Sequence, residues 1–182
     1  NNFIANAAEA AKTDLDAVDE GVKAEIEALQ TIRDEVEMYH SLGLVDDATY
    51  DMYNNIFSQT EQNIQEAAED NKANINKTLT EAYNTVLQQA FQGLDSDLLK
   101  GSNGEADYFN AAIYMMRYIA PIIKAIKDAG GEVNEEFANM FGIGMNMEDL
   151  IGALLDANDE NDLINWLKKY YAGESKLRSE ER

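Results

Sequence analysis

The sequence has 182 residues, enough for one core or two modest helical units, and it carries 14 Lys and Arg against 35 Asp and Glu. The resulting net charge of −21 argues against binding to nucleic acid or to an anionic membrane through a basic patch. Because there is no Cys, disulfides, Cys-based zinc sites and thiol catalysis are excluded. The single Pro and the abundance of helix-forming residues predict an all-α chain.

The first predicted helix covers about residues 3–40 and has an apolar stripe with alternating spacings of four and three. The stripe consists of Ile4, Ala8, Ala11, Leu15, Val18, Val22, Glu25, Leu29, Ile32, Val36 and Tyr39, with Glu25 as its one charged member. This is the spacing of a coiled-coil seam, sustained over about five heptads. The pattern stops before Gly43, which suits the left-handed end of a helix, and Asp46, which suits an N-cap.

A second predicted helix runs from about Asp47 to at least Phe91. Its stripe consists of Tyr50, Tyr53, Phe57, Thr60, Ile64, Ala67, Asn71, Ile75, Leu79, Ala82 and Val86. When the stripes are laid antiparallel, the numbers of facing residues add up to 89 or 90 throughout. The sequence therefore predicts a long antiparallel coiled-coil hairpin over residues 1–100, with its tip at 41–46. The polar seam residues Glu25, Thr60 and Asn71 either fix the register or face a third helix or water.

The second half is predicted to be a small bundle of about four helices over residues 105–173, joined to the hairpin by a linker at 101–104. A helix at 105–129, apolar nearly all round, is expected to be central and to be kinked or divided at Pro121. Shorter helices are expected at 135–142, 147–157 and 160–172, capped in turn by Asn134, by Asn146 and by Asn158 or Asp159. The charged tail 174–182 either extends the last helix or is disordered.

Catalytic and metal-binding groupings are not predicted. His40 is the only histidine, so a triad with a histidine base cannot be built elsewhere and Glu-x-x-His pairs are absent. Residues 156–162 resemble the start of a calcium loop, but Asn161 stands where glycine is needed and Leu167 where the closing Glu is needed. The sequence predicts no catalytic residue, no metal and no cofactor, and the charged residues within 108–126 argue against a membrane span.

Residues 42–50, Leu-Gly-Leu-Val-Asp-Asp-Ala-Thr-Tyr, carry a family resemblance. The segment resembles a hairpin tip that recurs in tail tape-measure and other helical proteins of bacteriophages, and in short bacterial oligomerisation modules. The long hairpin rich in Ala, Gln and Asn is similar in composition to segments of tape-measure proteins. The resemblance implies a role based on length and self-association, and it supplies no catalytic residue.

The leading hypothesis is a non-enzymatic structural or assembly module that binds a protein partner, or a copy of itself, through helical surfaces. The residues expected to form an interaction tip are Tyr39, Leu44, Val45, Tyr50 and Tyr53. One alternative, based on the charge, is an acidic inhibitor or decoy that binds a basic protein surface. Another is an excised extracellular sensor or adhesion module, because the chain begins with Asn1 instead of Met. The cellular compartment stays open.

Overall fold

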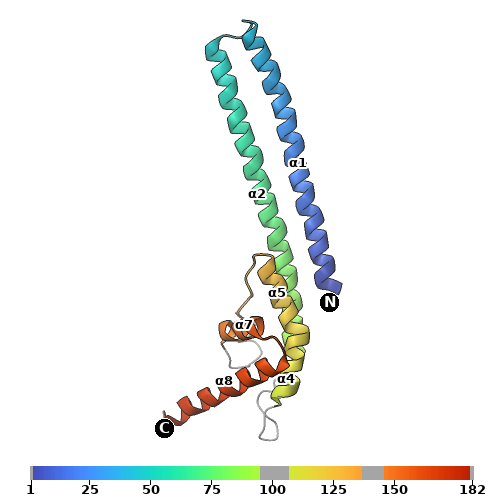
Figure 1. The fold of residues 1–182 in the computed structure, drawn as a ribbon, viewed down its shortest axis with the longest axis vertical. Helices are drawn as coiled ribbons and strands as arrows, with labels where there is room; N and C mark the ends of the chain where they lie inside the picture. The colour runs from blue at the N-terminus through green and yellow to red at the C-terminus, as the bar shows by residue number, and fades with distance from the viewer. Residues whose placement is uncertain (1, 95–106, 137–145, 181–182) are drawn as a thin grey trace. The chain divides into compact units, whose positions relative to one another are not determined.

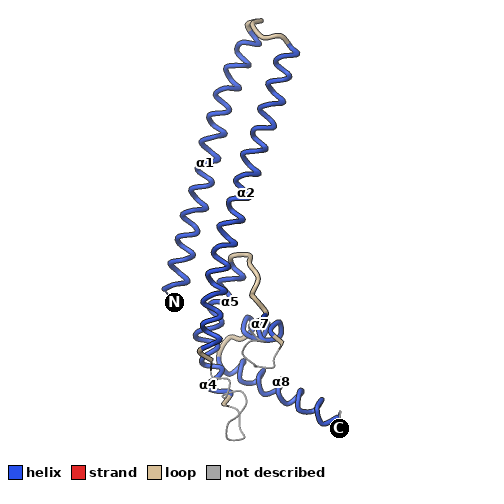
Figure 2. The backbone as a smooth tube through the Cα atoms, turned by 180° about the vertical axis from the view of Figure 1, so that it is seen from behind, coloured by secondary structure: helices blue, strands red, loops and turns tan. Residues whose placement is uncertain are grey.

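The computed structural model describes residues 2–94, 107–136 and 146–180, and the regular structure within these ranges is helical (Figures 1 and 2). The helices are α1 (Asn2–Ser41), α2 (Asp47–Gln92), α4 (Tyr108–Tyr114), the π-helical segment η1 (Met115–Ile119), α5 (Ala120–Asp128), α7 (Met147–Asp156) and α8 (Glu160–Glu180). The predicted all-α class, a long helix pair followed by a smaller helical bundle, is confirmed. The predicted linker at 101–104 lies outside the described residues.

The contacts divide the chain into two compact units. One unit is the hairpin of residues 5–78, formed by most of α1 and the first two thirds of α2. The other contains residues 1–4 and 79–182. The boundary falls inside the continuous helix α2, so the last turns of this helix belong to the core of the second unit.

The hairpin turn forms as its sequence predicts. Gly43 has a φ of 76°, and its N–H donates to the His40 carbonyl while the Leu44 N–H donates to the Tyr39 carbonyl. These two bonds are the Schellman arrangement that satisfies the last carbonyls of a helix. On the other side of the turn, the Asp46 carboxylate accepts from the Thr49 N–H at 2.7 Å and caps α2. The pKa of Asp46 is lowered by hydrogen bonding from Thr49, so the capping stabilisation is full above the ordinary pKa and is lost as the pH falls through the lowered one.

The seam between α1 and α2 follows a longer period than the predicted heptads. The better-covered residues of α1 are Ile4, Ala7, Ala11, Leu15, Val18, Val22, Ile26, Leu29, Arg33, Val36 and His40. Their mean spacing is about 3.6 residues, that of a straight α-helix, whereas a heptad pattern repeats every ~3.5 residues and drifts away from it. The predicted seam positions Glu25, Ile32 and Tyr39 are consequently exposed, and the next residue along the chain takes each place.

The same one-residue correction applies to α2. The seam positions of this helix within the hairpin are Tyr50, Asn54, Phe57, Glu61, Ile64, Ala68, Lys72 and Ile75. The predicted members Tyr53, Ala67 and Asn71 are exposed instead, and Thr60 is half-buried. Glu25 and Asn71 therefore lie outside the seam and are exposed, which agrees with the predicted alternative that they face water or another helix. Two ion pairs join the helices, one between Asp19 and Lys72 and one between Arg33 and Glu61.

The predicted antiparallel register agrees with the contacts that cross the hairpin. The rings of His40 and Tyr50 stack with centroids 3.9 Å apart, and the Arg33 guanidinium lies 5.7 Å from the centre of the Phe57 ring. The residue numbers of both pairs add up to 90, one more than the 89 that the apolar stripes predict for this end of the hairpin. The predicted register was thus correct to within one residue, and several individual seam residues were displaced by one position.

The core of the second unit gathers residues from all of its helices. α2 contributes Tyr83, Leu87 and Phe91, and the Tyr83 hydroxyl donates to the Ile4 carbonyl at 3.2 Å. Burial raises the pKa of this phenol. The other large, fully buried side chains are Met115, Ile119, Ile122, Ile123, Ile126, Leu150, Leu154, Leu163 and Leu167. The segment 108–128 is central, but Phe109 and Tyr118 remain exposed, so it is not covered all round.

Pro121 divides the central segment as predicted. Because proline has no N–H, a regular α-helix cannot continue through it without losing a hydrogen bond. The helix widens to the π form over η1, where the Ala120 N–H donates to the Met115 carbonyl five residues back, and α5 then starts with Pro121 in its first turn. The N–H groups in the first turn of a helix have no acceptor within that helix. The missing N–H of Pro121 therefore removes no hydrogen bond from α5.

The last two helices begin at the predicted caps. The Asn146 side chain accepts from the backbone of Glu148 and Asp149 at the start of α7, and Asp159 accepts from the Asp162 N–H at the start of α8. α8 continues to Glu180, past residue 172, so within the described residues the charged tail extends the last helix, one of the two predicted alternatives. The helix predicted at 135–142 falls almost entirely outside the described residues, although Asn134 does accept from the Glu136 N–H.

Gly131 provides a sharp test of packing in the second unit. A Cβ atom at this position would overlap the Thr80 side chain, including its Cβ, which cannot rotate away. We expect Gly131→Ala to destabilise the protein by about 1–3 kcal/mol, as overpacking does. Urea denaturation followed by circular dichroism measures the loss. Thr80→Gly should restore part of it in the double variant, whereas strictly additive losses would show that the two residues are not in contact.

Candidate functional site

The hairpin tip presents an unusual number of uncovered apolar side chains. Within the described residues, eight of the twelve large hydrophobic side chains that are exposed lie between residues 32 and 56: Ile32, Met38, Tyr39, Leu42, Leu44, Met52, Tyr53 and Ile56. Single exposed apolar residues are ordinary, but a gathering in one region is typical of a surface that binds another protein. The tip is therefore the strongest candidate site.

The five predicted tip residues divide into two groups. Tyr39, Leu44 and Tyr53 are exposed, and Leu44 is the most open at 71%. Leu44 is therefore mostly open to solvent. Val45 and Tyr50 are half-buried, and Tyr50 stacks on His40. The exposed group is available to a partner, whereas the second group stabilises the turn.

Two polar residues near the tip, His40 and Arg33, lie in the seam, a position that the apolar stripe did not predict. His40 stacks on Tyr50, and its Nε2 lies 2.7 Å from a carboxylate oxygen of Asp47. Arg33 covers the Phe57 ring and pairs with Glu61 at 3.3 Å. Both side chains cover the seam with their apolar parts, as long amphipathic side chains do. A pattern of apolar residues does not include such positions, although each lies four residues after a seam residue, His40 after Val36 and Arg33 after Leu29.

Four of the eight exposed apolar residues near the tip have a common relation to the seam. Ile32 and Tyr39 come one position before the seam residues Arg33 and His40, and Tyr53 and Ile56 come one position before Asn54 and Phe57. One residue corresponds to a turn of about 100° around the helix. Because α1 and α2 run in opposite directions and face each other, this turn leads to the same side of the pair on both helices. We call the residues that immediately precede the seam positions the preceding flank.

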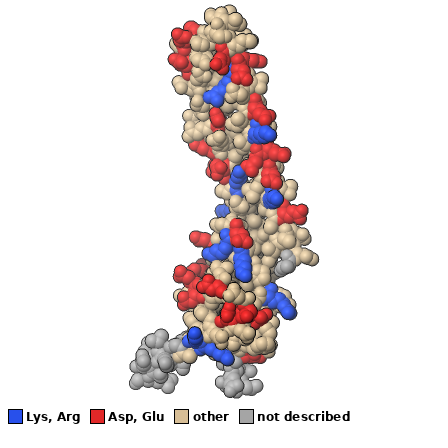
Figure 3. All heavy atoms as spheres, in the orientation of Figure 1, with Lys and Arg blue, Asp and Glu red and all other residues tan. Residues whose placement is uncertain are grey.

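The residues that immediately follow the seam positions form the opposite side, the following flank. On α1 these are Ala5, Ala8, Lys12, Asp16, Asp19, Lys23, Glu27, Gln30, Asp34, Glu37 and Ser41, and on α2 they are Asp51, Asn55, Ser58, Gln62, Gln65, Glu69, Ala73 and Asn76. Figure 3 shows acidic side chains on the surface of the hairpin near its tip end. The following flank is thus mostly charged on α1 and mostly polar on α2, as a solvated helix surface is, in contrast to the apolar preceding flank near the tip.

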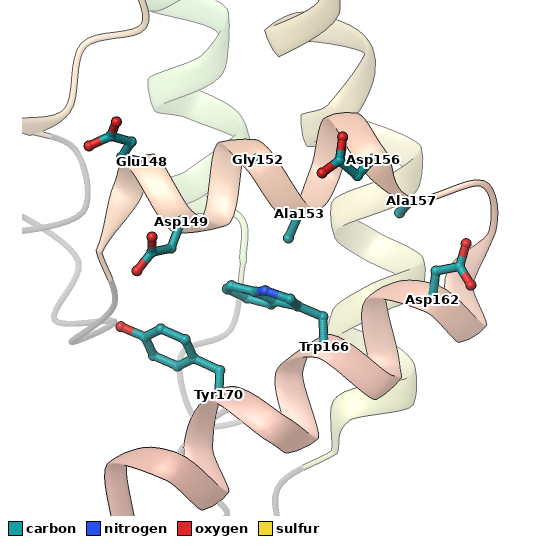
Figure 4. Close-up of a pocket in the computed structure, with 9 residues that line it drawn as sticks. All are labelled: Glu148, Asp149, Gly152, Ala153, Asp156, Ala157, Asp162, Trp166 and Tyr170. Carbon is teal, nitrogen blue, oxygen red and sulfur yellow. The ribbon is translucent and has the colours of Figure 1, made fainter. Parts of the chain in front are cut away.

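A separate cavity of about 560 Å³ lies between α7 and α8 in the second unit (Figure 4). Trp166 and Tyr170 extend into it from α8, with ring centroids 5.1 Å apart, and carboxylates line its edges. Figure 4 shows Asp149 turned towards the rings, whereas Glu148 is turned away from them. The Tyr170 hydroxyl already accepts from the Asn146 N–H at 3.2 Å. Two of the acidic residues, Glu148 and Asp149, lie in the first turn of α7, where the helix dipole favours negative charge whether or not a ligand binds.

In the part of the chain that the structure describes, His, Asp and Glu residues do not form a group of three or more that could hold a metal ion. None of the described helices combines the length and the apolar character needed to cross a membrane. Comparisons with models of protein families, with curated proteins and with solved structures find no match to this chain.

Proposed function

We propose that this chain is a non-enzymatic structural or assembly module that binds protein through the helical surface of its hairpin. The observation that carries the proposal is the gathering of exposed apolar side chains near the tip, on helices whose other exposed positions are mostly polar. Leaving side chains such as Ile32 and Ile56 about half exposed, at 50% and 51%, forfeits part of the free energy that their burial would contribute. A protein that binds over Ile32 and Ile56 removes them from water, and this burial favours binding.

The physical character of the hairpin suits such a role. Its helices are held by an apolar seam, by two cross-helix ion pairs and by capped ends at the turn, so the exposed face is presented on a defined scaffold. A preorganised surface loses less conformational entropy on binding than a flexible one. The resemblance of the tip to those of helical phage proteins supports an assembly role, in which a protein acts through its length and its contacts.

Co-purification of tagged chain tests the proposal. The wild-type chain should retain protein, either an untagged copy or another protein of its source, and Ile32→Glu with Ile56→Glu should abolish that retention. A variant with the same added charge on the following flank, Gln30→Glu with Ser58→Glu, should retain the same protein. Identical material recovered with all three chains would contradict the proposal, provided that circular dichroism shows equal helix content.

A further inference from the structure

The preceding flank of α2 carries no charged residue over the whole length of the hairpin. Its positions are Thr49, Tyr53, Ile56, Thr60, Asn63, Ala67, Asn71, Asn74 and Thr78. All but Thr49 and Thr60 are exposed, and those two are half-buried. The rest of α2 in the hairpin is rich in charge, with Asp47, Asp51, Glu61, Glu66, Glu69, Asp70, Lys72 and Lys77. An exposed uncharged stripe of this length is unusual in a chain with a net charge of −21.

The corresponding positions of α1 are apolar or small apart from three acids. They are Ala10, Asp14, Ala17, Gly21, Glu25, Ala28, Ile32, Glu35 and Tyr39. Small side chains at Ala17, Gly21 and Ala28 allow another helix to approach closely, and the larger Ile32 and Tyr39 lie towards the tip. The flank therefore presents large apolar residues near the tip, and away from the tip it presents small residues on α1 and uncharged polar residues on α2, which another helix can approach.

From these observations we propose that the preceding flank is covered by the same flank of a second copy of this chain, so that two hairpins form a four-helix assembly. This inference rests on the proposed function and names its partner. A basic partner would be attracted by carboxylates, which lie mainly on the following flank and the outer surfaces. An uncharged stripe attracts no such partner, but it is where two chains of the same negative charge meet with least repulsion.

The charges on α1 define how the two copies meet. With a two-fold axis along the hairpins, α1 of one copy faces α2 of the other. Glu25 and Glu35 then face uncharged positions of the partner's α2 instead of each other. An arrangement that placed α1 against α1 would bring these carboxylates together, and like charges in contact are unfavourable. The asymmetry of charge between α1 and α2 on this flank therefore favours pairing of unlike helices.

The flank is large enough for a stable dimer. From Thr49 to Thr78 the stripe is about 44 Å long at a rise of ~1.5 Å per residue, and two adjacent helices are about 20 Å wide. The face then offers about 900 Å² on each copy, and stable interfaces bury about 800 Å² or more per partner.

Sedimentation equilibrium of the full chain, over concentrations from about 1 to 200 μM at physiological ionic strength, tests the inference. The wild-type chain should show twice the mass of one chain at the upper end. Ile56→Lys should weaken the association at least tenfold, whereas Ser58→Lys, which adds the same charge on the following flank, should leave it unchanged. Circular dichroism on both variants verifies that the hairpin is folded.

Two results would overturn the inference. One is a wild-type chain that remains a single copy over the whole range, and the other is equal weakening by Ile56→Lys and Ser58→Lys. In the first case the co-purification experiment still decides the proposed function: retention of a different protein through Ile32 and Ile56 would leave that function standing without the second copy.

Discussion

Phe57→Ala should lower the free energy of unfolding of the hairpin by about 3 kcal/mol, the lower end of the range for a buried phenylalanine. The Phe57 side chain is 5% exposed and is the largest buried side chain of the seam near the tip. It stacks against Tyr53, with centroids 6.3 Å apart, and the Arg33 guanidinium lies over its ring. Truncation removes apolar contact, leaves a cavity and deprives Arg33 of the aromatic face on which it rests.

Urea denaturation followed by circular dichroism, at one fixed protein concentration, measures this loss. Ser58→Ala is the matched control, because Ser58 is exposed on the next position of the same helix. We expect its effect to stay within about 0.5 kcal/mol, as for most surface substitutions. Equal stability of Phe57→Ala and the wild type would show that Phe57 does not lie in the seam, and the assigned register would then be wrong.

Ile123→Asp should destabilise the second unit by at least about 4 kcal/mol, because it combines the loss of a buried side chain with a buried, unpaired charge. Ile123 is fully buried on α5, next to the π segment and α7. The lysines of α5, Lys124 and Lys127, are exposed, so they lie outside the core that would surround the new carboxylate. Lys124→Asp, which places the same residue on the exposed side, should cost far less.

The loss in Ile123→Asp should depend on pH, whereas that in Ile123→Asn should not. Burial raises the pKa of a carboxyl group, so the penalty is absent below the ordinary pKa of an aspartate and grows as the pH rises towards the raised value. The difference in unfolding free energy between the two variants should therefore narrow between pH 7 and pH 4. A constant difference would mean that the carboxylate reaches solvent and that the core is more open than described.

The local features of the fold were predictable because they depend on a few neighbouring residues. Gly43 with Asp46, Asn146 and Pro121 each specify one turn of backbone through a left-handed φ, a cap or a missing N–H, and the structure has these features where the sequence places them. The antiparallel register was also predictable, since the sum of facing residue numbers averages over many positions and tolerates an error of one residue.

The surface that matters for function was harder to predict. A heptad template with a period of ~3.5 residues moved the seam by one position at Ile32 and Tyr39, and so assigned to the interior two residues that the structure exposes. Arg33 and His40 occupy the interior instead, and their polar ends conceal this role in the sequence. The preceding flank becomes visible only when the true seam is known, because the flank is defined by its position relative to the seam.

The corrected seam gives the hairpin two unlike sides. One side is charged along α1 and mostly polar along α2, and the other is apolar near the tip and uncharged along α2. Charged and polar residues on the first side are favourably solvated. Covering the apolar part of the second side with another surface is favourable, because it removes apolar side chains from water. A long hairpin with one such side is suited to binding another helical surface along that side, as the proposed function requires.

Protection of single cysteines tests this central claim most directly. The natural chain has no Cys, so one introduced thiol reports on one position. Asn63→Cys lies on the preceding flank and Gln65→Cys on the following flank, and both native residues are exposed. Reaction with a thiol reagent should slow as protein concentration rises for Asn63→Cys, but not for Gln65→Cys. Equal reaction rates of the two thiols at every concentration would contradict burial of the preceding flank by a second copy.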